Sequence, residues 1–161
     1  MKQDRFLIGI LIFIALLVAA ALALFFLRQD VPATYQPDST PEGVVFNFAL
    51  AIQRQDAERA YGYLADLENK PTKAAFRQVI LNSYIDTSAS VELGEVQMIS
   101  PDEAWVAVTI HYMPTGPFDT GWDSNENAIL VRQQSAWKLT YMPYPYWSYD
   151  WFQPTFEPVK P

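Results

Sequence analysis

The chain of 161 residues contains no cysteine, and its only histidine is His111. Thiol catalysis, thiolate zinc sites, iron–sulfur clusters and lipid attachment through cysteine are therefore excluded, and so is a metal site built from several histidines. Glycine is scarce, with 6 residues. No glycine-rich phosphate loop, Gly-x-Ser-x-Gly or His-Glu-x-x-His pattern occurs. We therefore expect a protein that is not an enzyme and that carries no cofactor and no metal.

Positive charge is also in short supply, with 11 Lys and Arg against 18 Asp and Glu. Only Lys2, Arg5 and Asp4 precede residue 28, so residues 28–161 carry 9 basic and 17 acidic side chains and a net charge of −8. A surface of this sign repels nucleic acid and anionic lipid headgroups. We expect no nucleic-acid partner and no electrostatic docking on anionic lipid.

One long run carries no charge at all, from Phe6 to Leu27. As a helix it would span roughly 33 Å, enough to cross a hydrocarbon core of ~30 Å. It is longer than the apolar region of a signal peptide, and Phe25, Phe26 and Leu27 follow its alanines where a cleavage site would need small residues. The run predicts a retained transmembrane helix over residues 6–27, preceded by a short stub over residues 1–5.

The flanking charges indicate the orientation of this helix. Lys2 and Arg5 precede it, whereas Arg28 is the only basic residue after it until Arg54. Because basic flanks stay in the cytoplasm, we predict a single-pass protein of the bacterial inner or plasma membrane. Its N-terminus is expected in the cytoplasm and its C-terminal domain in the periplasm or outside the cell.

Three alanines, Ala15, Ala19 and Ala23, recur at every fourth position of this helix. Small residues on one stripe let another membrane helix approach closely, which favours docking on other membrane-protein subunits. The plainer interpretation is that alanine is common in such helices.

The rest of the chain divides by its apolar periodicity. Residues 28–40 contain Pro32 and Pro37 and no periodic pattern, which predicts a linker. Helical spacing follows, and the expected N-caps of three helices are Thr40, Asp56 and Thr72.

From residue 89 the period changes to 2, which is typical of strands. We expect strands over 91–98 with a bulge at Gly94-Glu95, over 104–112, 128–133 and 136–141, and a loop over 113–125. Helices followed by a strand meander predict an α+β domain over residues 41–142.

The first two expected helices and the last strand carry a resemblance to a known family. The helices read Pro41-Glu42-x-Val44-Val45-x-x-Phe48-x-x-Ala51-Ile52-x-x-x-Asp56, then Ala60-Tyr61-x-Tyr63-Leu64, and the strand reads Ala136-Trp137-Lys138-Leu139-Thr140. This pattern resembles the NTF2-like (cystatin-like, SnoaL-like) superfamily. The resemblance implies a cone of about three helices on a curved antiparallel sheet that leaves a pocket. Members include ketosteroid-isomerase-like enzymes, transport factors and single-pass scaffold components of secretion machines.

Two sets of polar residues resemble possible sites but give no assignment. Ketosteroid-isomerase chemistry needs a carboxylate and acidic hydroxyls, and the chain offers Tyr61, Tyr84, Tyr112 and Asp86. None of them maps onto that family's catalytic positions, so the activity is not carried over, and His111 is expected to be a surface or hydrogen-bonded residue. Oxygen ligands cluster at Asp119, Asp123, Asn125 and Glu126. They lack the spacing of a calcium loop and are interpreted as polar loop residues.

The C-terminal tail, residues 143–161, is rich in aromatic residues and proline. Its partner-contact candidates are Tyr146, Trp147, Tyr149, Trp151 and Phe152. An extended chain would place Trp147, Tyr149 and Trp151 on one side. Such density is wasteful in a free tail. Three interpretations remain open: the tail closes its own domain, it contacts a protein partner, or it lies at a membrane interface or stacks on sugar.

Together these features predict a non-catalytic, single-pass accessory or scaffold subunit of a larger bacterial membrane complex, with its soluble domain on the outer face. Its partners would be the membrane and other membrane-protein subunits, contacted through the helix and the aromatic tail. The alternative is a membrane-tethered domain whose pocket binds a small apolar ligand such as a lipid or quinone-like molecule.

Overall fold

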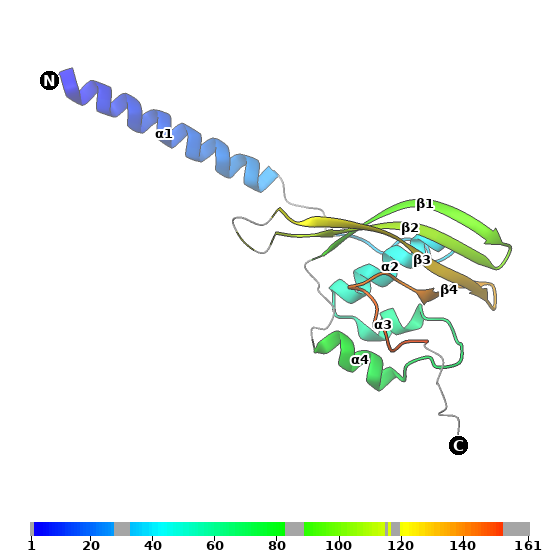
Figure 1. The fold of residues 1–161 in the computed structure, drawn as a ribbon. Helices are drawn as coiled ribbons and strands as arrows, with labels where there is room; N and C mark the ends of the chain where they lie inside the picture. The colour runs from blue at the N-terminus through cyan, green and yellow to red at the C-terminus, as the bar shows by residue number, and fades with distance from the viewer. Residues whose placement is uncertain (1, 28–32, 83–88, 115, 117–119, 153–161) are drawn as a thin grey trace. The chain divides into compact units, whose positions relative to one another are not determined.

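The computed structural model describes residues 2–27, 33–82, 89–114, 116 and 120–152 (Figure 1). The chain divides into two compact units, Met1–Thr34 and Tyr35–Pro161. The first unit is helical, and the second combines helices with an antiparallel sheet. The predicted α+β fold class is confirmed.

The first unit contains one helix, α1, over Lys2–Leu27. Its stretch Phe6–Leu24 has a mean hydropathy of 3.1, and none of it is buried against other parts of the protein. By length and composition this helix is able to cross a membrane, a property that membrane spans share with signal sequences. Ala15, Ala19 and Ala23 are exposed on α1.

The second unit begins with three helices: α2 over Pro41–Gln53, α3 over Ala57–Gly62 and α4 over Lys73–Leu81. Each starts at a predicted N-cap, because the side chains of Thr40, Asp56 and Thr72 accept backbone hydrogen bonds from the third residue that follows each of them. These bonds satisfy amide groups that the first helical turn leaves without partners. The three predicted helix starts are confirmed.

Four strands follow: β1 over Ser90–Ser100, β2 over Glu103–Tyr112, β3 over Trp122–Gln133 and β4 over Ala136–Tyr141. They form one antiparallel sheet in the order β1-β2-β3-β4. The register between β1 and β2 shifts between Leu93 and Val96, which confirms the predicted bulge. The sheet is curved and carries the helices on one side (Figure 1). This arrangement is consistent with the NTF2-like cone that the resemblance implies.

The predicted loop over 113–125 is wrong at its C-terminal end. β3 begins at Trp122, and its first half pairs with β2. This half reads Trp-Asp-Ser-Asn-Glu-Asn and is largely exposed. Because neither face of it is buried, it lacks the alternation that marks a half-buried strand, and the strand is recognisable only from its pairing.

Alternate residues of β2 form one wall of the core. Val106, Val108 and Ile110 are buried on the face that turns toward the helices, where Phe48 and Ile52 of α2 join the same cluster. The side chains between them lie on the outer face of the sheet and are half-buried. The inside and outside of the domain follow directly from this alternation.

Residues 35–40, which the sequence placed in the linker, pack on the domain. The buried amide of Asn47 in α2 accepts a hydrogen bond from Gln36 N and donates one to Gln36 O, both at 2.7 Å. Tyr35 stacks on the guanidinium of Arg59, 3.4 Å from the ring centroid. The compact unit accordingly begins at Tyr35.

We predict that Gly43→Ala loosens this entry segment. A Cβ at residue 43 would collide with the backbone oxygen of Pro37, which cannot move without displacing the segment. The variant should lose about 1–3 kcal/mol of unfolding free energy, as overpacked sites do. Gly62→Ala is the matched control, because its Cβ meets no atom within 4 Å. Urea unfolding of the full chain in detergent measures both, and equal stabilities would contradict the prediction.

Candidate functional site

After β4 the chain folds back into its own domain. Met142 and Tyr146 are fully buried, Trp147 and Trp151 are buried, and Phe152 is partly buried against the same cluster. We call these five residues the aromatic plug. Trp147 contributes to the same core cluster as Phe48 of α2 and Leu139 of β4. The plug therefore belongs to the hydrophobic core of the second unit.

Ring contacts connect the plug to two helices. The ring of Trp151 lies 4.7 Å from that of Phe76 in α4 and 5.0 Å from that of Trp147, and the ring of Trp147 lies 6.1 Å from that of Phe48 in α2. Such pairs stabilise by about 0.5–1.5 kcal/mol each beyond the area they bury. Distant parts of the chain are thereby joined through a single aromatic cluster.

A hydrogen-bonded hydroxyl adds a polar contact to the plug. Tyr146 donates its hydroxyl proton to the backbone oxygen of Ala89 at 2.6 Å, and Gln53 Nε2 donates to the same hydroxyl at 3.1 Å. Because Tyr146 is fully buried, these bonds replace the water that its hydroxyl would otherwise contact. They join the plug to the end of α2 and to the start of β1.

The tail is not extended at this point, so Trp147, Tyr149 and Trp151 do not share one side. The segment turns, with hydrogen bonds from Tyr146 N to Pro143 O and from Trp151 N to Ser148 O. Tyr149 is consequently 80% exposed, while Trp147 and Trp151 are buried. Burial of Tyr146, Trp147 and Trp151 favours the interpretation that the tail closes its own domain. Contact of the tail with a protein partner stays a prediction. Among the tail residues proposed for that contact, Tyr149 has a solvent-exposed side chain.

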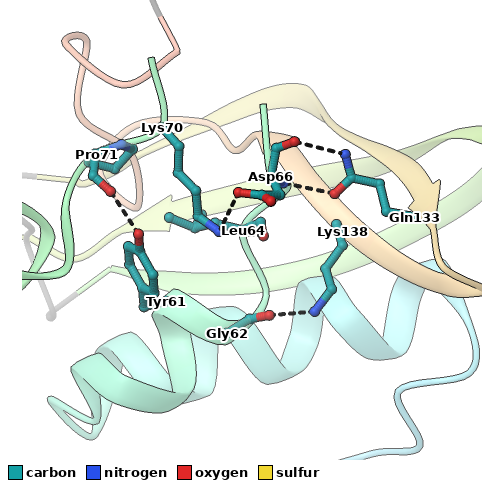
Figure 2. A network of polar contacts seen from close by, with 8 residues as sticks. All are labelled: Tyr61, Gly62, Leu64, Asp66, Lys70, Pro71, Gln133 and Lys138. Carbon is teal, nitrogen blue, oxygen red and sulfur yellow. Dashed lines mark hydrogen bonds and ion pairs between the residues drawn. The ribbon is translucent and has the colours of Figure 1, made fainter. Parts of the chain in front are cut away.

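A second feature is a polar groove of about 670 Å³ on the surface beside α3 and the β3–β4 turn. Lys70, Lys73 and Lys138 line it (Figure 2 draws the first and third), and they are all of the lysines in the described part of the second unit. Its floor is held by two bonds between the backbone of Asp66 and the side-chain amide of Gln133, at 2.7 and 3.3 Å. We call this feature the lysine groove.

Backbone oxygens and carboxylates around α3 partner the three ammonium groups. Lys138 Nζ donates to Gly62 O at 2.5 Å and Lys70 Nζ to Leu64 O at 3.4 Å (Figure 2), and Lys73 pairs with Glu58 at 3.3 Å. Cations are favourable here because the last carbonyls of a helix carry partial negative charge. The three lysines of the groove therefore already stabilise the chain around α3 through these contacts.

Electrostatics in the groove depend on its most buried lysine. Burial lowers the pKa of the Lys70 ammonium group, Asp66 at 4.0 Å opposes that shift, and Lys138 and Lys73 reinforce it. The Tyr61 ring lies 4.7 Å from Lys70 Nζ. The described groove residues can attract a carboxylate or another anionic group, but they include no base held against a nucleophile. Sequence reasoning missed the groove because Lys138 is far along the chain from Lys70 and Lys73.

The other sequence candidates do not converge. Tyr61 lines the groove and Tyr112 ends β2, whereas Tyr84, Asp86 and Asp119 lie outside the described residues. Asp123, Asn125 and Glu126 lie in β3 and bond to three different partners, His111, Thr109 and Tyr141. Among the described residues no group of three or more His, Cys, Asp or Glu side chains is placed to hold a metal.

Comparison with known proteins places the likeness at the level of fold. No family model matches the chain, and no curated protein does. A ketosteroid isomerase-like protein from Erwinia carotovora atroseptica is similar in structure, with 16% identity over 66% of this chain and 92% of that one and a TM-score of 0.45. An NTF-2 like protein of unknown function from Shewanella oneidensis shares 12% identity over 60% and 88%, with a TM-score of 0.44. A domain with a cystatin-like fold from Nostoc punctiforme shares 11% over 66% and 75%, with a TM-score of 0.48.

We predict that Trp147→Ala destabilises the domain by about 3–5 kcal/mol, because it leaves a cavity among aromatic rings. Tyr149→Ala is the matched control two residues away, and its exposed ring should cost within about 0.5 kcal/mol. Chemical unfolding of the full chain in detergent measures both. Similar small losses for the two variants would show that the tail does not fill the interior.

A further prediction concerns His111, whose Nδ1 lies 2.8 Å from Asp123 and whose Nε2 lies 3.2 Å from Glu92. These hydrogen bonds, the one to Asp123 most strongly, raise the pKa of the imidazole above its ordinary value. The hydrogen bonds of protonated His111 therefore stabilise the fold fully below about pH 6.5, the ordinary pKa of an imidazole in the unfolded chain. This contribution to stability is lost as pH rises through the raised pKa of His111 in the folded state. In NMR titrations Asp123→Asn should lower the His111 pKa more than Glu92→Gln does. The reverse order would contradict this account.

Proposed function

We propose that this chain is a non-catalytic, single-pass accessory or scaffold subunit of a larger bacterial membrane complex. In this proposal α1 is a retained anchor, the N-terminus is cytoplasmic, and the second unit lies on the outer face of the inner or plasma membrane. The aromatic plug is the observation that carries it. When the interior of the domain is filled by its own side chains, function is left to the exterior surfaces.

The chemistry of α1 supports the anchor. Its uncovered apolar stretch, Phe6–Leu24, is stable in hydrocarbon or against other helices but not in water. The charges of Lys2 and Arg5 at its start support a cytoplasmic N-terminus. In the membrane the alanine stripe, Ala15, Ala19 and Ala23, is the surface where a second helix can approach most closely.

The size of the cavity beside the plug argues against the ligand-binding alternative. It measures about 60 Å³ and is lined by residues that include Tyr141, Tyr144 and Trp147. Pockets for lipid-sized or drug-sized ligands usually enclose roughly 300–1,000 Å³. A lipid or quinone-like molecule would therefore enter this cavity only by displacing the plug, at the energetic cost of the ring contacts that it makes.

The native mass of the protein tests the proposal. The chain is extracted from its own membranes in mild detergent, and the proteins that co-migrate with it are identified. We expect an assembly of fixed stoichiometry that is much larger than the 18.4 kDa chain. A protein that migrates alone as a monomer with its detergent would overturn the proposal.

We further predict that Ala19→Leu weakens the assembly, because a larger side chain on the alanine stripe prevents close helix approach. Ala21→Leu is the matched control, since residue 21 lies about 200° around the helix from residue 19. Native electrophoresis of the two variants should show free subunit for Ala19→Leu only. Intact complexes for both variants would exclude the stripe as the contact.

A further inference from the structure

One end of the second unit exposes an ordered aromatic surface. At this end β2 and β3 project past the helices (Figure 1). Met113 is 61% and Trp122 is 59% exposed, and Tyr144 is also exposed. The Tyr112 ring stacks on Trp122 with centroids 3.9 Å apart and planes at 11°. We call these four residues the aromatic tip.

The tip is held in place before any partner binds. Tyr112 and Trp122 form a directly opposed pair of β2 and β3, and the Tyr112 hydroxyl donates to Tyr144 O at 2.9 Å. Ordered aromatic side chains lose little conformational entropy on binding, so they favour association. An exposed cluster of this kind in water is otherwise a liability.

The tether from α1 enters the domain at the same end. Tyr35, the first residue of the second unit, lies over the guanidinium of Arg54 at 5.0 Å. The neighbouring Gln53 donates to Ala89 O at 3.4 Å, next to the start of β1. The first residue of β1 pairs with His111, which directly precedes the tip.

The length of the tether limits how far this end can lie from the bilayer. Residues 28–34 separate α1 from Tyr35, and seven residues reach at most about 25 Å even when fully extended. If α1 spans a membrane, the end of the domain that bears the tip is therefore the end that is kept near the lipid surface.

We propose that the aromatic tip inserts into the interfacial layer of the bilayer that α1 spans. This inference depends on the anchor in the proposed function. Tryptophan and tyrosine favour that layer because their rings have an apolar body and a polar edge. Asp123 and Glu92 lie beside the tip around His111, so attachment rests on ring burial in zwitterionic lipid and not on attraction to anionic headgroups.

The opposite end of the sheet provides the internal comparison. Met98 and Ile99 are exposed there, so apolar exposure alone does not distinguish the two ends. That end lies at the other terminus of β1 and β2, away from Tyr35 and Ala89. The lipid contact is assigned to the tip because the tip lies near the tether and carries the stacked rings of Tyr112 and Trp122.

Single-cysteine labelling tests this inference cleanly, because the chain has no cysteine. Thr120→Cys beside the tip and Ser100→Cys at the opposite end both replace exposed hydroxyls. Each full-length variant is labelled with nitrobenzoxadiazole and placed, without other proteins, in phosphatidylcholine nanodiscs that carry a headgroup nitroxide. We expect several-fold stronger quenching and a blue-shifted emission for Thr120→Cys. Equal quenching of the two labels, or an aqueous spectrum at residue 120, would overturn the inference.

A second variant and a second readout separate the possible failures. Trp122→Ser in the Thr120→Cys chain should lower the quenching without unfolding the domain, because Trp122 is exposed. Unchanged quenching would contradict insertion of the aromatic tip.

Co-flotation of the full chain with phosphatidylcholine vesicles after an alkaline wash reports on α1. Loss of flotation overturns the anchor, whereas flotation with an aqueous tip overturns the lipid contact alone. A tip protected only when the native complex is present would assign it to a protein partner and overturn the inference.

Discussion

The second unit depends on the packing of Trp147 and Trp151 against Phe48 and Phe76. α4 buries only Phe76 and Ile80, and an isolated helix of nine residues is too short to be stable in water. The rings of Trp151 in the tail and of Tyr61 in α3 supply the aromatic surface against which Phe76 packs. The described residues contain no disulfide and few ion pairs, so this aromatic cluster contributes stabilisation that cross-links provide in disulfide-bonded domains.

Filling the interior changes which parts of the fold are available for function. In a cone with an open pocket, ligands and catalytic groups meet inside. Here the interior is occupied by Tyr146, Trp147 and Trp151, and the outside carries the features that can contact other molecules: the alanine stripe, the lysine groove, Tyr149 and the aromatic tip. Each is a surface of a different chemistry, and the proposed accessory or scaffold role rests on these exterior surfaces.

Local signals in the sequence predicted local structure well. Thr40, Asp56 and Thr72 act as caps through bonds to residues three positions away, so their role is readable from short spacings. The bulge near Gly94 was readable because the apolar alternation changes phase there. The family resemblance correctly implied helices on one face of an antiparallel sheet.

Features that depend on pairing or on distant contacts were missed. The first half of β3 has solvent on both faces and is a strand only because β2 lies beside it. The lysine groove exists because residues near 64 pair with Leu139 and bring Lys70 close to Lys138. Alternation in the tail would give one aromatic face in an extended chain, but turns at Pro143 and Ser148 place Tyr149 outside and Trp147 and Trp151 inside.

The central claim is that the tail closes its own domain, and the most direct test is proton NMR of the isolated full-length chain in detergent. The account predicts nuclear Overhauser contacts between the ring protons of Trp151 and Phe76, whose centroids lie 4.7 Å apart, together with slow solvent exchange of the Trp151 indole proton. Absence of that contact with a rapidly exchanging indole would mean that the tail is free in the isolated protein, and the account would be contradicted.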